Sequence, residues 1–245
     1  MMIKTRFAPS PTGWLHIGGV RTALYSWLYA RKNNGKFYLR IDDTDTTRST
    51  DVYKNSIVFA LNQLGLNYDD EITYQSNRFD YYIDKIEQLL NDDMAYYDQV
   101  EVNEKTKETD LSVQFENRLN RKGYVIRFRN QKDHSVTIND SVHGEITFDP
   151  KVFFDVVILR SSGIPTYNLS SVVDDIDLGI THLIRGDDHL SNLPVQVNLF
   201  ESFKAKVPSF SHLPMIHGED GKRLSKRHGA VDINHFLNEG YRVDA

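Results

Sequence analysis

The sequence predicts an α/β protein, with a Rossmann-type parallel-sheet nucleotide-binding fold that is split by an inserted mixed α/β subdomain. Three observations lead to this fold class. Apolar runs alternate with helical periodicity over residues 1–95, β-type alternation follows over 96–164, and the β–α pattern resumes over 165–230. We therefore expect two halves of one domain on either side of an insert, with residues 231–245 as the start of a connecting region.

The first half begins with a strand expected over residues 3–8 and turn residues over 9–13. A helix follows, because apolar residues between 20 and 28 recur at helical spacing, and Gly35 is expected to end it. A second strand is expected over 37–41, and two more helices follow it. The residues that predict the three helices are Val20, Ala23, Leu24, Trp27 and Leu28; Tyr53, Ile57, Ala60, Leu61 and Leu64; and Phe79, Tyr82, Ile83, Ile86, Leu89 and Leu90.

The pattern changes in the insert and then returns. Residues 98–122 are polar, although Leu111, Phe115 and Leu119 could form a short helix. Alternating runs then predict an antiparallel sheet, after which strands and helices alternate again. The expected strands are at 124–129, 136–138, 145–148, 155–160, 181–185 and 212–217, and a helix is expected through Leu193, Val197 and Phe200.

The composition is ordinary for a globular protein. Apolar residues make up 40% of the 245 residues and charged residues 26%, which allows a sizeable core. The sequence has no cysteine, no apolar signal region and no run long enough to span a membrane, so a cytoplasmic protein without membrane contact is expected. With a net charge of −5, any nucleic-acid partner needs a locally basic face.

Two separated stretches indicate a site for a nucleoside triphosphate. The first, His16-Ile17-Gly18-Gly19, lies in a glycine-rich loop that opens the first expected helix, where free N–H groups favour an anion. The second is the lysine-rich run at residues 222–228. An imidazole and an ammonium group stabilise charge on a transferring phosphoryl group. Each stretch alone is equally well a helix-start turn or a solvated loop, but the two in this order favour the functional interpretation.

The two stretches resemble the two ATP motifs of class I aminoacyl-tRNA synthetases. Further stretches extend the resemblance to the catalytic N-terminal part of the glutamyl-tRNA synthetases. These stretches are residues 5–13, 39–45, 165–168, 173–175 and 181–189. The resemblance covers the chain nearly end to end and is poor only over 98–122. It implies an ATP-dependent ligase that joins L-glutamate to tRNA-Glu, with Mg²⁺ accompanying ATP.

The resemblance also implies roles for individual residues. His16 and Lys226 would be catalytic, and with Gly18 and Arg227 they would bind ATP. The residues that would surround glutamate are Arg6, Ala8, Ser10, Asp42, Tyr167 and Arg185. The insert would contact the acceptor end of the tRNA. Its candidates for phosphate contacts are Lys122, Arg127, Arg129 and Arg160, although each is more simply a solvated strand residue.

The chemistry of glutamate suits these roles. Arg6 and Arg185 offer planar donor groups to its two carboxylates, and Asp42 offers a charge to its ammonium group. Without the resemblance the simpler interpretations are a surface ion pair of Arg185 with Asp187 or Asp188, and a loop-capping role for Asp42.

The chain departs from the family in three places. Asp42 stands where the glutamyl family usually has Glu, which shortens the reach toward the amino group. The second ATP motif has Arg223 in place of Lys and Leu224 in place of Met, while Lys226 is intact. Some members hold zinc with cysteines in the insert, and this insert has none.

No metal site is expected. The sequence contains no thiolate ligand, and His134 and His143 stand alone in the insert. A closed zinc site needs four ligands, so we expect no structural zinc.

Other functions stay open at this point. A glutamyl-queuosine tRNA synthetase is a short paralogue whose length fits, but the cysteine-free insert and the residues Thr44 and Asp45 argue against it. A catalytically silent paralogue that binds tRNA or nucleotide is opposed by the retention of His16, Lys226 and Arg185. A small-molecule nucleotidylyltransferase would not explain the lysine-rich run or the insert.

After residues 231–240, the five residues 241–245 are too short for the helix that the resemblance places there, so the connecting region is expected to be truncated. The chain is then a catalytic fragment of a longer, monomeric enzyme. Such a fragment should charge tRNA-Glu poorly and without anticodon discrimination.

Replacing Lys226 by Ala should abolish adenylate formation and leave the fold intact. The lost ammonium group would have stabilised the triphosphate, and removal of one such group typically slows a reaction by about 10²–10³. Pyrophosphate exchange measures the rate, and circular dichroism controls for folding. Near-normal exchange by a folded variant would show that Lys226 has another role.

Overall fold

The computed structural model describes residues 2–45, 47–100, 113–217, 233 and 239–242. Its first half is an α/β unit with parallel strands, in which β1 pairs with β2 and β2 pairs with β3. The elements of this half are β1 (Lys4–Phe7), α1 (Ile17–Lys32), β2 (Lys36–Ile41), α2 (Asp51–Gln63), β3 (Thr73–Tyr74), η1 (Gln75–Arg78) and α3 (Phe79–Asn91). The predicted β–α alternation is therefore confirmed here.

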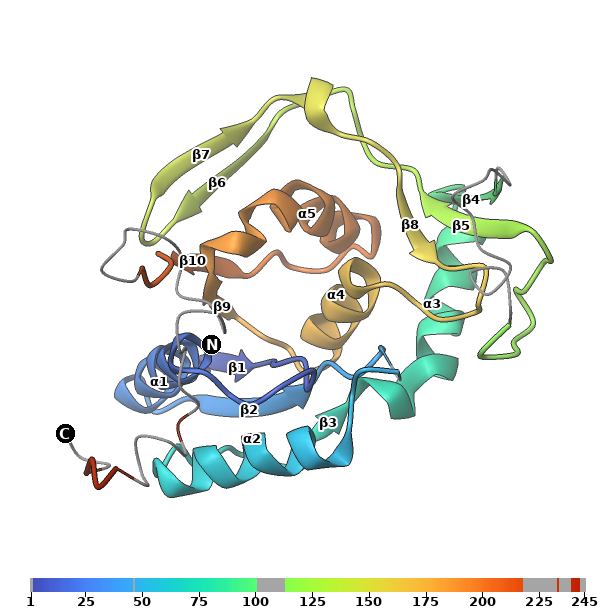
Figure 1. Cartoon of the computed structure of the whole chain (residues 1–245). Helices are drawn as coiled ribbons and strands as arrows, with labels where there is room; N and C mark the ends of the chain where they lie inside the picture. Colours follow the sequence, from blue (N-terminus) through green and yellow to red (C-terminus); the bar gives the residue numbers. More distant parts are fainter. Residues whose placement is uncertain (1, 46, 101–112, 218–232, 234–238, 243–245) are drawn as a thin grey trace.

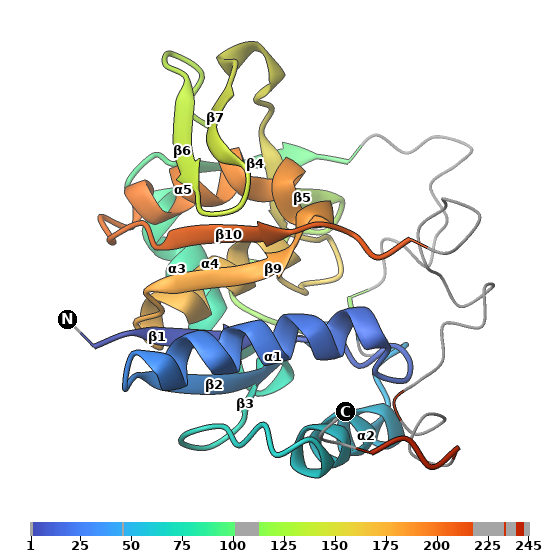
Figure 2. The same ribbon diagram turned by 90° about the vertical axis from the view of Figure 1, so that its left-hand side faces the viewer.

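The second half supplies another parallel pair, β9 with β10. Its elements are α4 (Tyr167–Asp177), β9 (His182–Gly186), η4 (Asp187–Asn192), α5 (Leu193–Ser202) and β10 (Ser209–Leu213). The two halves meet where the Thr181 backbone N–H donates to the Lys4 carbonyl over 2.9 Å. Figure 2 shows β10, β9, β1 and β2 in succession, and α1 packs against β1, β2 and β9. The mixed α/β architecture with parallel strands is confirmed.

The strands between the two halves are antiparallel. They are β4 (Ala95–Gln99), β5 (Tyr124–Phe128), β6 (Val136–Asp140), β7 (Gly144–Phe148) and β8 (Val156–Leu159), with the short η3 (Pro150–Val152) before β8. β4, β5 and β8 form one sheet, and β6 and β7 form a hairpin that runs along the outside of α5 toward β10 (Figure 1). The division into units at 95/96, 164/165 and 230/231 stays a prediction.

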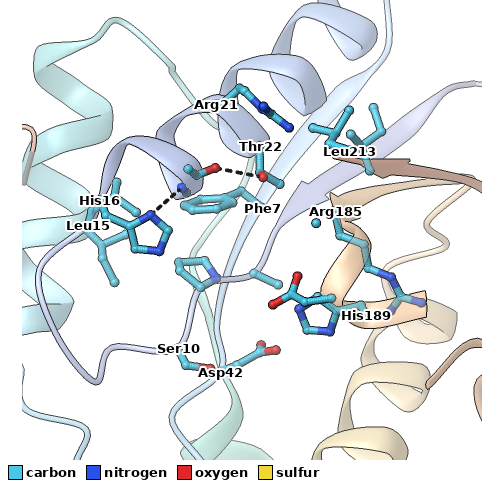
Figure 3. Close-up of a pocket in the computed structure, with 18 of the residues that line it drawn as sticks. Phe7, Ser10, Leu15, His16, Arg21, Thr22, Asp42, Arg185, His189 and Leu213 are labelled. Carbon is cyan, nitrogen blue, oxygen red and sulfur yellow. Dashed lines mark hydrogen bonds between the residues drawn. The ribbon is translucent and has the colours of Figure 1, made fainter. Parts of the chain in front are cut away.

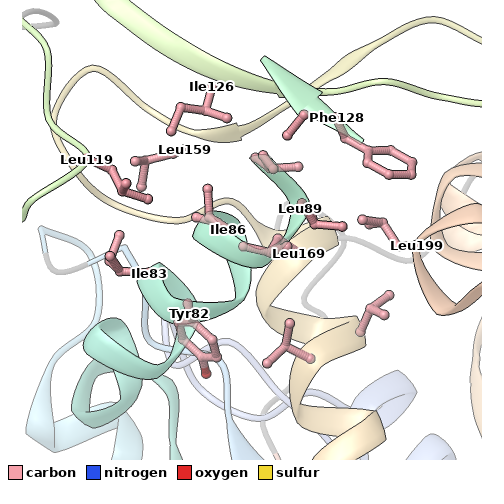
Figure 4. Packing of buried hydrophobic residues seen from close by; sticks show 14 of the residues in the cluster. Tyr82, Ile83, Ile86, Leu89, Leu119, Ile126, Phe128, Leu159, Leu169 and Leu199 are labelled. Carbon is pink, nitrogen blue, oxygen red and sulfur yellow. The ribbon is translucent and has the colours of Figure 1, made fainter. Parts of the chain in front are cut away.

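A hydrophobic core joins this antiparallel sheet to the helices (Figure 4). The buried face of α3 carries the residues that its periodicity predicted, and it packs against β5, β8, α4 and α5. The cluster includes Tyr82, Ile83, Ile86, Leu89, Ile126, Phe128, Leu159, Leu169 and Leu199. The antiparallel sheet is thus packed onto α3, α4 and α5 through apolar contacts.

The prediction of which apolar residues of α1 are buried is partly wrong. Val20 and Ala23 are buried as expected, but Leu24 and Leu28 are 39% and 47% exposed. The helix contacts β1, β2 and β9 through a narrow face of small residues, so leucines just beside that face remain in solvent. Spacing alone does not show how wide the buried face is.

Two expected boundaries also differ. The last strand runs from Ser209 to Leu213 rather than over 212–217, because it pairs with β9 and is followed by Pro214, which has no N–H to donate. The residues Phe115 and Leu119 form turns instead of a short helix, and Leu111 lies outside the described residues. The side-chain amides of Asn117 and Asn120 both donate to the Phe115 carbonyl, which replaces helical backbone bonding.

None of the helices in the described part of the chain has the length and apolar character needed to cross a bilayer.

The residue that turns the chain after α1 is Asn34, with φ +49°, rather than the predicted Gly35. Gly35 is needed for another reason. A Cβ at this position would overlap the carbonyl oxygen of Ile3, to which Lys36 donates its backbone N–H over 2.9 Å. The glycine therefore lets β2 start beside the residue that precedes β1.

We predict that Gly35→Ala lowers the free energy of unfolding by about 3 kcal/mol, because the new methyl group meets backbone that cannot rotate away. Gly65→Ala is the matched control, since Gly65 has φ +66° and open space around it, and should cost about 1 kcal/mol. Urea denaturation measures both. Equal losses would show that the contact with Ile3 is easily relieved.

Candidate functional site

A cavity of about 270 Å³ opens at the carboxyl ends of the parallel strands, where α/β folds bind ligands (Figure 3). Its walls come from the loop after β1, the first turn of α1, the end of β2, the start of α4, the β9–η4 junction and the segment after β10. Eight of the predicted site residues line it: Arg6, Ala8, Ser10, His16, Gly18, Asp42, Tyr167 and Arg185. Lys226 and Arg227 lie outside the described residues. The structure thus brings together residues from both halves of the chain.

The first turn of α1 forms one wall. His16 is the N-cap residue, and its Nδ1 accepts a hydrogen bond from the Gly19 backbone N–H over 3.3 Å (Figure 3). A Cβ on Gly18 would come within 3.0 Å of the imidazole, and one on Gly19 within 2.7 Å of the Leu15 side chain. The two glycines therefore allow the close packing of this turn. The helix N-terminus that opens into the cavity favours an anion.

Arg185 provides a cation on the opposite wall. Its side chain is only 4% exposed, so it is not the surface ion-pair residue of the simpler interpretation. Its Nε donates to His212 Nε2 over 3.0 Å and its Nη1 donates to Gln196 Oε1 over 2.7 Å. Within the residues described, its Nη2 is buried without a hydrogen-bond partner.

The hydrogen-bond partners of Arg185 are thus neutral, and the charge of Asp175 acts on its guanidinium group less strongly than burial does. Burial lowers the pKa of Arg185 below its usual value, but a guanidinium group does not lose its proton in proteins. A buried cation with one unused donor and two neutral partners is an incomplete site. A carboxylate or phosphate in the cavity would complete it.

The floor of the cavity holds a network of buried ion pairs around Arg40. Arg40 is fully buried, and its Nε and Nη2 donate to the two carboxylate oxygens of Asp42 over 2.6 and 3.1 Å. Its Nη1 donates to Asp175 over 2.8 Å, and Asp175 also accepts from Arg6 Nε over 3.1 Å. Sequence reasoning missed Arg40. The signal was a charged residue inside the otherwise apolar strand at 37–41.

These contacts change the expected roles of Arg6 and Asp42. Asp42 does not cap a loop; Asp43 does, by accepting from the Ser76 backbone N–H over 2.8 Å. Burial raises the pKa of Asp42 to about 6, although Arg40 opposes the shift, so its carboxylate is charged at neutral pH. Arg6 and Asp42 each have an internal counter-ion, unlike Arg185. Their contacts with glutamate stay a prediction.

Tyr167 at the start of α4 contacts a second residue that sequence reasoning missed, His189. The Tyr167 hydroxyl lies 3.0 Å from His189 Nδ1, and both line the cavity. Burial, and then the charge of Arg185, lower the pKa of His189 to about 4. The imidazole is therefore neutral at neutral pH, and it adds no positive charge beside Arg185 (Figure 3).

Comparison with known proteins shows the family to which this chain belongs. The family model described as tRNA synthetases class I (E and Q), catalytic domain, matches residues 2–244. A structure of a putative arginyl tRNA synthetase from Campylobacter jejuni, at 15% identity and a TM-score of 0.55 over 91% of this chain and 57% of its own, shares the fold. The chain belongs to the class I tRNA synthetase (E and Q) catalytic domain family.

More similar proteins carry a narrower name. Glutamate–tRNA ligase of Francisella philomiragia is 48% identical over the whole chain, and glutamate–tRNA ligase 1 of Alkalilimnicola ehrlichii is 48% identical over 99% of it. The crystal structure of a glutamate tRNA ligase from Elizabethkingia meningosepticum in complex with its amino acid matches with a TM-score of 0.82 and 34% identity, over 94% of this chain and 53% of its own. The chain spans 55% of the length of these two curated relatives.

The low pKa of His189 predicts a loss of stability in acid. The folded-state pKa is about 4 and the ordinary value is 6.5, so the unfolded chain binds the proton more tightly. The contribution of His189 to the free energy of unfolding is fully present above about pH 6.5, and it falls by about 3 kcal/mol as the pH drops to 4.

His189→Gln should remove this part of the pH dependence. The quantity to measure is the difference in unfolding free energy between the two proteins from pH 7 to pH 4, because other groups cancel in that difference. A constant difference for His189→Gln would contradict the prediction.

Proposed function

We propose that this chain is the catalytic part of a glutamate–tRNA ligase, which activates L-glutamate with ATP to glutamyl-adenylate. The observation that supports this most directly is the unused Nη2 donor of Arg185, buried in a cavity whose opposite wall is a helix N-terminus. The first feature suits a substrate carboxylate and the second suits a phosphate. The names of the similar proteins support the same assignment.

In the proposed first step, the α-carboxylate of glutamate attacks the α-phosphorus of ATP, and the bond to the departing pyrophosphate breaks. Arg185 would hold the side-chain carboxylate, while His16 and the first turn of α1 would lie against the phosphates. Lys226 would stabilise the leaving charge. Mg²⁺ enters as part of the ATP complex. Such a site acts by positioning and charge stabilisation rather than by a covalent intermediate.

In the proposed second step, a terminal ribose hydroxyl of tRNA-Glu attacks the adenylate and releases AMP. The insert would contact the acceptor end. Arg127 pairs with Asp98 over 2.5 Å and Arg129 with Asp93 over 3.3 Å, while Lys122 and Arg160 are exposed. The latter two are the better candidates for phosphate contacts. A cytoplasmic location, which agrees with the absence of cysteine from the sequence, stays part of this proposal, and so does a monomeric state.

The proposal is tested by pyrophosphate exchange with glutamate, with and without tRNA-Glu. Exchange that depends on glutamate supports it. The attachment point of labelled glutamate, at the 3′ ribose or at a queuosine base, separates the ligase from the glutamyl-queuosine alternative. Exchange under neither condition would favour a catalytically silent paralogue.

Replacing Arg185 by Gln should lower the kcat/KM value for glutamate more than the value for glutamine. Only glutamate loses an ion pair in the variant, and a hydrogen bond to a charged group contributes about 1.5–3 kcal/mol, so the ratio of kcat/KM values should fall at least about tenfold. Arg118→Gln, at an exposed arginine that pairs with Asp84 and Glu87, is the matched control. An equal loss for both amino acids would assign Arg185 a different role.

A further inference from the structure

We propose that His212 and Asp140 are positioning residues for Arg185, and that through them the β6–β7 hairpin of the insert sets the amino-acid selectivity of the cavity. The inference rests on the proposed function, because it concerns the residue that would hold the substrate carboxylate. Neither residue belongs to the stretches that carry the family resemblance.

Three side chains form a continuous chain of hydrogen bonds from the cavity to the hairpin. Arg185 Nε lies 3.0 Å from His212 Nε2, and His212 Nδ1 lies 2.7 Å from Asp140 Oδ2. The side chains of His212 and Asp140 are fully buried. Solvent therefore cannot replace any partner in this chain, and the geometry of each group depends on the next.

The chemistry of the two ends determines the tautomer of His212. A guanidinium group only donates, so Nε2 must be unprotonated to accept from Arg185. A carboxylate only accepts, so Nδ1 must carry the proton that it shares with Asp140. The neutral Nδ1–H form is the one that satisfies both contacts. Burial, and then the charge of Arg185, also lower the pKa of His212, which keeps the ring neutral.

Asp140 also holds the hairpin. Its Oδ1 accepts from the backbone N–H groups of Val142 and His143 over 2.9 and 3.1 Å, in the turn between β6 and β7. The backbone N–H of His212 donates to Asp140 as well, over 3.1 Å, and Ser141 donates to the Phe210 carbonyl over 3.0 Å. One carboxylate thus joins the turn of the insert to β10.

These contacts orient the guanidinium plane of Arg185. His212 holds Nε and Gln196 holds Nη1, so the remaining nitrogen, Nη2, is left for a ligand in the cavity. A planar group held at two nitrogens presents the third in one direction, which favours a carboxylate at one position over a neutral amide. Loss of the His212 contact would loosen that direction without removing the charge.

Asp140→Asn is the central test, because it reverses the tautomer with little change in shape. The amide oxygen can still accept from the turn and, at the Oδ1 position, from the backbone N–H of His212, which lies 3.3 Å from Oδ1 in the unchanged chain. The NH₂ group then faces the His212 ring and donates to Nδ1. The proton of His212 must then move to Nε2, where it faces the N–H of Arg185. We expect the KM for glutamate in pyrophosphate exchange to rise about tenfold or more, with the KM for ATP unchanged. The control is Asp133→Asn, which alters the exposed contact between Asp133 and His134 and should change neither KM value.

His212→Gln separates positioning from general damage. The Gln oxygen can accept from Arg185 whatever stands at position 140, so Asp140→Asn should have little effect on the KM for glutamate in the His212→Gln background. His212→Asn, which is too short to reach Arg185, should resemble Asp140→Asn. Equal effects of Asp140→Asn in both backgrounds would overturn the inference and indicate damage to the hairpin.

Nitrogen-15 NMR of labelled histidine provides a readout besides activity. The proton of His212 should be on Nδ1 in the unchanged chain and on Nε2 in Asp140→Asn. A proton on Nε2 in the unchanged chain would overturn the inference whether or not the enzyme is active. If the unchanged chain shows no glutamate-dependent exchange, the proposed function fails first; if it is active and Asp140→Asn leaves the KM for glutamate unchanged, only the inference fails.

Discussion

The buried guanidinium of Arg40 holds the two halves of the catalytic unit together beneath the cavity. It extends from β2 and makes a bidentate contact with Asp42 at the end of the same strand, and it also reaches Asp175 in α4, more than 130 positions later. Charges removed from water are tolerated when each has a partner and its hydrogen bonds are made. The strand and the helix can therefore occupy only the arrangement in which these partners meet.

The same ion pairs fix the positions of the strands and the helix that line the cavity. Asp175 binds Arg6 as well as Arg40, which fixes the end of β1 relative to β2. Asp174 beside it accepts from Gln75, Arg78 and Tyr82, and so extends the network to η1 and α3. The antiparallel sheet packs on α3 through apolar contacts. Helix α3 is thus held both by the polar network below the cavity and by the apolar contacts around it.

The contrast between Arg40 and Arg185 separates structural charge from charge that is available to a ligand. Both are almost completely buried. Although burial opposes it, the carboxylates of Asp42 and Asp175 raise the pKa of Arg40, whereas burial lowers the pKa of Arg185, whose hydrogen-bond partners are neutral. A buried charge that carboxylates contact directly is balanced within the protein, whereas one whose hydrogen-bond partners are neutral keeps a donor for an anion. By this criterion Arg185 is the centre of the candidate site.

The sequence by itself determined most helices and strands of the two halves, and it picked out eight residues that line one cavity. Helix α3 follows directly from the spacing of its apolar residues, and the glycines after His16 mark the turn that opens α1, because periodicity and turn chemistry are local properties. Tertiary structure decided the partners of the charged groups, including Arg40 with Asp175 and His212 with Asp140. It also decided that Leu24 and Leu28 of α1 remain exposed. These outcomes depend on the register and packing of segments far apart in the chain, and side-chain spacing within one segment carries no information about them.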